Sequence, residues 1–153
     1  MKNLFLILCS LLLITSCSDD DSDSGSSRNK ITYNGRTYPV VKVEGLEVNN
    51  INGNNTFITG TIDQNQDYGF IIQLYGHTIS SASGTYTVNA GDDYDPEIHC
   101  KVVMNLPDSD MLISEGEVSV NIKGETITID FDVEELDTET PVIGYYEGSF
   151  IIK

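Results

Sequence analysis

The chain has 153 residues, a length that favours one domain with short flanking segments. It carries 24 Asp and Glu against 8 Lys and Arg, a formal net charge of −16, and a surface this acidic repels phosphate backbones. The composition therefore speaks against nucleic acid as a partner. Hydrophobic residues make up 39% of the chain, which is enough for a packed core and argues against a wholly disordered protein.

Residues 1–16 have the organisation of a signal peptide. Lys2 precedes an almost unbroken apolar run over residues 4–14. A transmembrane helix needs about 20 residues, so this run is too short to span a bilayer. A basic start before a short apolar run is typical of a secretory signal, which is removed and takes no part in the fold.

The end of this segment, Ile14-Thr15-Ser16-Cys17, resembles a bacterial lipobox. The resemblance implies that the signal is cleaved before Cys17, that the Cys17 thiol is lipidated and that the new amino terminus is acylated. Several acyl chains anchor a protein to a membrane almost permanently. The alternative interpretation is an ordinary secreted protein with a chance cysteine after its signal.

Residues 17–30 read as the lipidated cysteine followed by a flexible linker, because residues 18–27 are only Ser, Gly and Asp and have no surface to bury. Its first residues resemble the surface-export signal of Bacteroidota lipoproteins: Ser18, Asp19, Asp20 and Asp21. That resemblance implies a lipid-anchored protein of the outer membrane that is exposed at the cell surface. The alternative is a plain spacer on a lipoprotein that faces the periplasm.

Residues 31–153 form the expected folded domain. Residues 1–30 hold four Asp and three basic residues, so nearly all of the net charge lies in this domain and favours cations or basic proteins as partners. Cys9 leaves with the signal and Cys17 is lipidated, which leaves Cys100 alone. No disulfide can therefore form inside the domain, and its stability must come from packing.

Apolar residues in the domain recur with a period of two, between turns rich in Gly, Asn, Asp and Pro, and no helical period persists. Asn34-Gly35 predicts a type I′ hairpin turn, and residues 49–55 predict a long polar turn. Apolar residues on both parities of 68–75 predict a central strand covered on both faces. The expected strands are 31–33, 36–43 with an extension over 46–48, 56–62, 68–75, 85–88, 98–105, 115–122, 125–133 and 142–152.

About nine such strands without a crossover helix predict an all-β fold. It is either an antiparallel β-sandwich or a flattened up-and-down barrel that resembles a lipocalin, whose strands can enclose a small ligand. The segments 84–88, 117–133 and 144–150 resemble a pattern common in small Bacteroidota lipoproteins of unknown function. That resemblance implies the fold and carries no catalytic residues with it.

The hairpin around Lys123-Gly124 has a register that can be predicted. A two-residue loop at these positions places Glu117 opposite Asp130, and it places Glu115 opposite Asp132 on the outer face. Like charges directly opposite in a sheet are destabilising. Either solvent screens them, or the face docks a cation or a basic protein.

Two further groups carry oxygen or sulfur ligands. Asp93, Asp95 and Glu97 alternate within one loop and could offer oxygens to Ca²⁺, although the same residues also cap turns. His99 and Cys100 are neighbours in a strand and point to opposite faces, so they are not expected to share zinc. We expect a buried Cys100 beside an exposed His99 and no bound cofactor, with Ca²⁺ as the alternative.

The sequence offers no catalytic signature, since it has neither a Gly-x-Ser-x-Gly elbow nor a phosphate-binding loop, and only two histidines. We expect a non-enzymatic binding or structural domain on the outer membrane, accessory to glycan or nutrient capture. The alternative is a small acidic inhibitor or immunity-type lipoprotein that binds a basic protein. Glycans stack on aromatic faces, and the candidate platforms are Tyr68, Tyr75, Tyr94, Tyr145 and Tyr146, of which the last two point to opposite faces.

Overall fold

The computed structural model describes residues 28–51, 53–62, 67–91 and 93–153. The expected signal peptide, Cys17 and the export residues Ser18, Asp19, Asp20 and Asp21 lie outside these ranges. The described elements are β1 (Lys30–Tyr33), β2 (Arg36–Pro39), β3 (Lys42–Asn50), β4 (Gly53–Thr61), β5 (Gly69–Tyr75), the 3-10 helix η1 (Ile79–Ser81), β6 (Gly84–Val88), β7 (His99–Leu106), β8 (Ser109–Lys123), β9 (Thr126–Glu135) and β10 (Pro141–Ile152).

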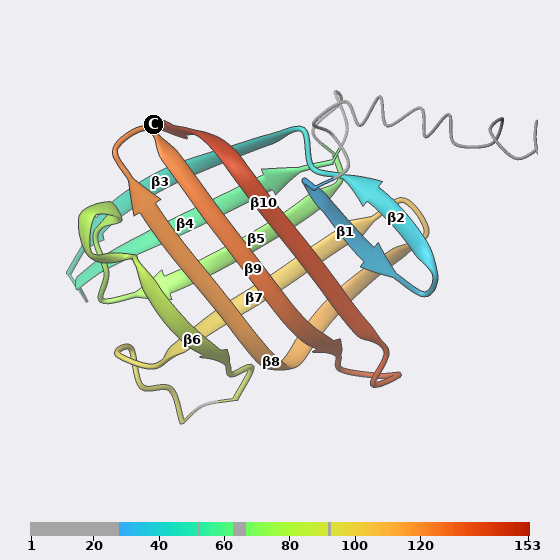
Figure 1. Ribbon diagram of the computed structural model, residues 1–153. Coiled ribbons are helices and arrows are strands. Elements are labelled where there is room, and N and C mark those ends of the chain that lie inside the picture. Colours follow the sequence, from blue (N-terminus) through green and yellow to red (C-terminus); the bar gives the residue numbers. More distant parts are fainter. Residues whose placement is uncertain (1–27, 52, 63–66, 92) are drawn as a thin grey trace, which may run out of the picture.

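The strands form two layers that cross each other (Figure 1). The front layer runs β2-β1-β10-β9-β8-β6, and the back layer runs β3-β4-β5-β7 and ends on the first residues of β8. β8 pairs first with β7 and then with β9, with a register shift between Ile113 and Glu115 where it passes from one layer to the other. The prediction of an all-β sandwich or flattened barrel is confirmed.

The ring of strands closes where the end of β10 meets β3. Phe150 pairs with Val43 and Ile152 with Gly45, in parallel orientation. β6 and β7 also pair in parallel, through two residue pairs. The expectation of antiparallel neighbours throughout is therefore wrong at these two contacts, and every other pairing of the ring is antiparallel.

Side chains from both layers fill the space between them. Alternate residues of each strand are buried, and the rings of Phe70 in β5 and Phe131 in β9 meet edge to face with centroids 5.4 Å apart. The largest of the side chains that are less than 2% exposed come from both layers. The space that a lipocalin-like barrel would use for a ligand is occupied by this core.

β5 lies centrally in the back layer, but only one of its faces is covered. Phe70, Ile72 and Leu74 are buried, whereas Ile71 is 42% exposed. The prediction of a strand covered on both faces is wrong because the fold has only two layers, so that each layer keeps one face in solvent.

Several strand boundaries also differ from the expectation, and β8 begins at Ser109 rather than at residue 115. The expected strand over 36–43 is divided, because β2 ends at Pro39 and the chain crosses to the back layer before Lys42. Proline has no N–H with which to continue the ladder, and Val40 turns into the core. The long polar turn expected over 49–55 is instead mostly strand, since Asn50 pairs with Gly53.

The register predicted for the β8–β9 hairpin is wrong by two residues. The two turn residues are Gly124 and Glu125, and Lys123 pairs with Thr126. Gly124 supplies the positive φ (+61°) at the first turn position, as a type II′ turn requires, and Thr126 Oγ1 donates to the Lys123 carbonyl at 2.9 Å. A shift of two residues preserves which face each side chain occupies, so the outer carboxylates keep their face and change partners.

Candidate functional site

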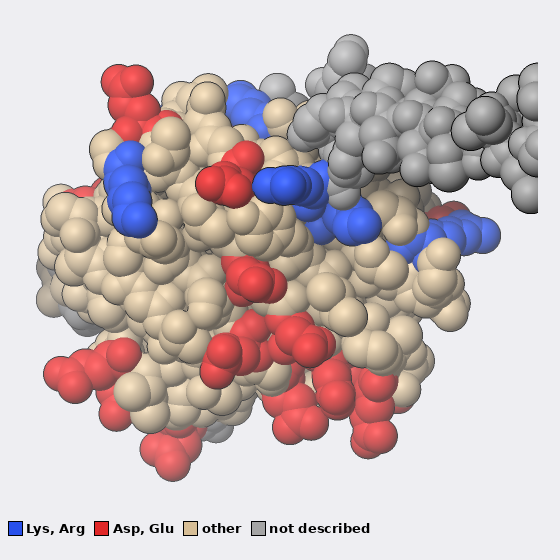
Figure 2. Space-filling view, in the orientation of Figure 1, with Lys and Arg blue, Asp and Glu red and all other residues tan. Residues whose placement is uncertain are grey.

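The outer surface of β8 and β9 in the front layer carries a group of carboxylates, here called the acidic face: Glu115, Glu117, Asp130, Asp132 and Glu134. Glu117 lies directly opposite Asp132, and Glu115 lies opposite Glu134. Figure 2 shows acidic side chains gathered over the lower part of this layer, with the basic side chains in the upper part of the view.

β10 adds an apolar and an aromatic side chain to the border of the acidic face. Ile143 pairs with Asp132 and is 52% exposed, and Tyr145 pairs with Asp130. The hydroxyl of Tyr145 donates to Glu147 Oε2 at 2.8 Å, and this hydrogen bond to a carboxylate raises the pKa of Tyr145. A protein docking here would meet negative charge next to exposed apolar surface.

The three ion pairs found among the described residues lie away from the acidic face. Arg36 forms an ion pair with Asp108, and Glu44 receives Lys42 at 2.5 Å and Lys153 at 2.8 Å. Within the described ranges, none of these ion pairs reaches a carboxylate of the acidic face. The exposed carboxylates of Glu117 and Asp132 thus lie opposite each other on neighbouring strands, and solvent screens the repulsion between them.

The two neighbouring tyrosines of β10 separate as their alternation predicts. Tyr146 is 6% exposed and belongs to the core, and its hydroxyl donates to the Ser149 carbonyl at 3.0 Å. The assignment of Tyr146 to a ligand or partner face is therefore wrong, because successive strand residues point to opposite faces and the inner face is buried. Tyr145 remains at the surface.

Two other candidate tyrosines pack against each other. The rings of Tyr75 and Tyr94 meet edge to face at 4.9 Å, and the Tyr94 hydroxyl donates to the His99 carbonyl. Burial raises the pKa of Tyr94 to about 12. These contacts explain both tyrosines as supports of the loop before β7.

The loop with the expected calcium ligands is held by hydrogen bonds. Asp95 Oδ1 accepts a hydrogen bond from the Glu97 N–H at 2.9 Å, and the Asp93 carbonyl accepts one from Asn89 Nδ2 at 2.6 Å. Among the described residues no three His, Cys, Asp or Glu are placed to hold a metal ion. The structure thus gives Asp95 the turn-capping role, and calcium at Asp93, Asp95 and Glu97 stays a prediction.

His99 and Cys100 occupy opposite faces of β7, as predicted. Cys100 is fully buried, and this burial raises the pKa of its thiol to about 12. His99 is half-buried rather than exposed, and its Nδ1 accepts the Asp95 N–H at 2.9 Å. Both residues therefore have structural roles: Cys100 is part of the core, and His99 holds the preceding loop through Asp95.

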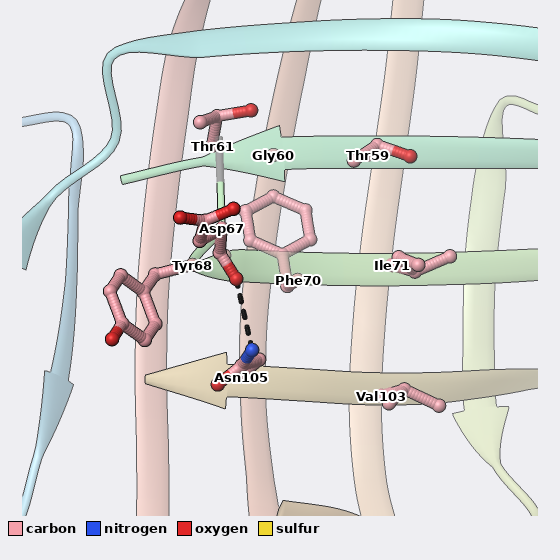
Figure 3. Close-up of a pocket in the computed structure, with 10 residues that line it drawn as sticks. Thr59, Gly60, Thr61, Asp67, Tyr68, Phe70, Ile71, Val103 and Asn105 are labelled. Atoms are coloured by element: carbon pink, nitrogen blue, oxygen red, sulfur yellow. Dashed lines mark hydrogen bonds between the residues drawn. The ribbon is translucent and has the colours of Figure 1, made fainter. Parts of the chain in front are cut away.

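A shallow hollow of about 220 Å³ lies on the outer face of the back layer (Figure 3). Thr61, Gly69 and Asn105 form one row across β4, β5 and β7. Gly69 is required there, because a Cβ atom on it would overlap the Gly60 carbonyl oxygen. Asn105 Nδ2 donates to the Asp67 carbonyl at 2.9 Å at one end of the hollow. Ile71 and Val103 border it as an exposed apolar ridge.

A second hollow of about 280 Å³ lies between the β1–β2 hairpin and the β7–β8 turn. Its lining residues are Tyr33, Asn34, Arg36, Tyr38, Asp108 and Ser109. We call it the hairpin cleft. Neither hollow was predicted, because each joins segments that are far apart in the chain.

No family model, curated protein or solved structure matches this chain. Within the described ranges, no helix has the length and apolar character needed to cross a bilayer.

Proposed function

We propose that this chain is a lipid-anchored, non-enzymatic binding protein of the outer membrane whose acidic face docks a basic protein. The observation that carries the proposal is the direct pairing of Glu117 with Asp132 beside the exposed Ile143. Like charges in this position cost a few tenths of a kcal/mol in stability, which a cationic partner would offset on binding.

The distribution of charge and surface supports this choice of partner. The net charge of −16 attracts basic proteins over distances of about a Debye length and speeds their association. Ile143 and Tyr145 offer the kind of apolar and aromatic surface that contributes most to protein interfaces. The sequence alone favoured glycan or nutrient capture, and the burial of Tyr146 weakens that interpretation at this face.

The anchoring part of the proposal is supported by the lipobox-like Ile14-Thr15-Ser16-Cys17 and the acidic residues after it. We expect the native protein, extracted from membranes with detergent, to begin at Cys17 and to carry acyl chains on that residue. Intact-mass spectrometry and sequencing of the amino-terminal peptide test this. Recovery of a chain that starts at Met1 without acyl groups would contradict it.

Docking at the acidic face can be tested with an oligolysine peptide as the basic probe, titrated into the full chain by calorimetry. We expect the double variant Glu117→Gln/Asp132→Asn to bind about tenfold more weakly at low salt, equivalent to roughly 1.4 kcal/mol. We also expect binding to weaken as NaCl rises toward 0.15 M.

The matched control removes the same charge elsewhere, with Glu97→Gln/Asp110→Asn, two exposed positions outside the acidic face. This variant should keep most of the affinity. Equal losses in both double variants would show that the peptide responds only to net charge, and the assignment of docking to the acidic face would be wrong.

A further inference from the structure

The hairpin cleft opens where the two layers of the fold end. β2 is the last strand of the front layer and pairs only with β1, so the inner face of this hairpin extends past the core. Ile31 on that face is fully buried, whereas Arg36 is exposed. The β7–β8 turn of the back layer faces it across the cleft and contributes Asp108 and Ser109.

The two aromatic walls of the cleft are held by their hydroxyl groups. Tyr33 donates to Oε2 of Glu135 at 2.8 Å, and Glu135 is only 8% exposed and also accepts a hydrogen bond from Thr138. Tyr38 donates to Asp108 Oδ2 at 3.2 Å. Both tyrosines are therefore oriented before any ligand arrives, which reduces the entropy cost of binding.

The rim of the cleft combines donors and acceptors without net charge. Arg36 Nη1 donates to Asp108 Oδ2, the same oxygen that Tyr38 uses. A guanidinium has five N–H donors, so most donors of Arg36 stay available after this hydrogen bond. The neighbouring Asp108 Oδ1 accepts no hydrogen bond from the described residues, so it is available as an acceptor. Neighbouring donors and acceptors of this kind match a pair of adjacent hydroxyl groups, each of which can donate and accept.

These features select a ligand class. An aromatic ring presents an apolar face to C–H groups and a polar edge to water, which suits a ring that is hydroxylated at its rim and apolar on its faces. An anionic ligand would have to displace Asp108 from Arg36 against a net charge of −16. The volume of about 280 Å³ lies just below the range of about 300–1,000 Å³ for sites of drug-sized ligands.

We propose that the hairpin cleft binds one ring of an uncharged sugar, with an apolar face against Tyr33 and Tyr38 and with adjacent hydroxyls on Arg36 and Asp108. This site lies apart from the acidic face and does not rest on docking there. Failure of one proposal leaves the other standing, because the sugar site needs no cationic partner and little salt dependence is expected of it.

The test is a titration of the full chain with the methyl glycosides of glucose, galactose and mannose, followed by the amide signals in two-dimensional NMR. We expect at least one glycoside to shift the amides of residues 33–38 and 107–109 in a saturable way, with a Kd on the order of 1 mM. Asp108→Asn should weaken this binding about fivefold or more, since it removes an ionised acceptor.

Asp110→Asn is the matched control, because Asp110 is an exposed carboxylate two residues away that does not line the cleft. It should leave the affinity unchanged, and thermal melting verifies that both variants fold. The proposal is overturned if no glycoside gives saturable shifts at these amides at tens of mM, roughly tenfold above the expected Kd. It is also overturned if Asp108→Asn binds as well as the native chain, or if sodium sulfate produces the same shifts.

Discussion

At the scale of single residues, pairs of glycine and phenylalanine set the spacing of the core. Gly60 pairs with Phe70 between β4 and β5, and Gly144 pairs with Phe131 between β9 and β10. In each pair the ring lies over the glycine of the neighbouring strand, where a Cβ atom would overlap it. The two rings then meet edge to face between the layers, so that four residues from four strands form the centre of the molecule.

We expect Gly144→Ala to destabilise the protein by about 1–3 kcal/mol, the usual cost of overpacking a filled core. The new methyl group would occupy the place of the Phe131 ring. Denaturation in urea measures the change in the free energy of unfolding. Gly91→Ala is the control, because Gly91 is exposed and lies outside the strands.

A double-mutant cycle with Phe131→Leu identifies the cause. In that background Gly144→Ala should cost at least about 1 kcal/mol less, because the smaller side chain leaves room for the methyl group. An unchanged cost would mean that the strain lies in the backbone and not in the contact between Gly144 and Phe131.

At the scale of elements, the last residues of β10 close the ring against β3. Only three residue pairs join these strands, and the contact is strengthened by Phe150, whose ring lies over Gly45. The Lys153 N–H also donates to the Gly45 carbonyl at 2.9 Å. Glu44 of β3 accepts both Lys153 and Lys42, so a short parallel contact gains an ion pair at its end.

This closure predicts a dependence of stability on pH. The hydrogen bond from Lys153, followed by the one from Lys42, lowers the pKa of Glu44 below its ordinary value of 4.5. Because the folded-state pKa is depressed, the stabilisation is complete above the unfolded-state value and is lost as the pH falls through the folded-state value.

We therefore expect Glu44→Gln to lower the free energy of unfolding at pH 7 by up to about 1 kcal/mol, and to have a smaller effect at pH 3. Urea denaturation at both pH values tests this, with Glu97→Gln as the control at an exposed site. A loss for Glu44→Gln that is the same at both pH values would assign its effect to packing and not to charge.

At the scale of the whole molecule, negative charge exceeds positive charge, with 24 Asp and Glu against 8 Lys and Arg. The three ion pairs of the described residues use Arg36, Lys42 and Lys153, and the acidic face lies apart from them. Repulsion among the remaining carboxylates opposes the compact state, and it is screened by dissolved salt. Stability and docking thus depend on the same charges.

We expect the melting temperature to rise as NaCl increases from about 0.01 M to about 0.2 M, because the Debye length shortens from about 30 Å to below 10 Å over this range. Asp132→Asn, which removes the carboxylate opposite Glu117, should melt higher at low salt and respond less to salt. Scanning calorimetry measures both effects. A melting temperature that falls with salt would mean that favourable ion pairs outweigh the repulsion.

Local features of the sequence were enough to predict much of this architecture. Alternation placed β6, β7, β9 and β10 to within two residues, although β8 begins six residues before its predicted start at residue 115. Asn34-Gly35 gave the first hairpin turn, with φ of +47° and +73°. Alternation also separated Tyr145 from Tyr146. These features depend only on residues that are close together in the chain, and their pattern can be read directly from a single sequence.

Long-range contacts could not be predicted from the sequence, and they decided the remaining features of the fold. Which strands meet decides three features: the division of residues 36–43 between two layers, the exposure of Ile71 and the partner of Glu117. Alternation cannot fix that partner, because a register shifted by two residues gives the same pattern of faces. The hairpin cleft likewise joins Arg36 to Asp108 across 72 positions. By itself the sequence determined the class of fold and the faces of its strands, whereas only the tertiary structure decided which side chains share a surface, because that choice is made by packing between distant segments.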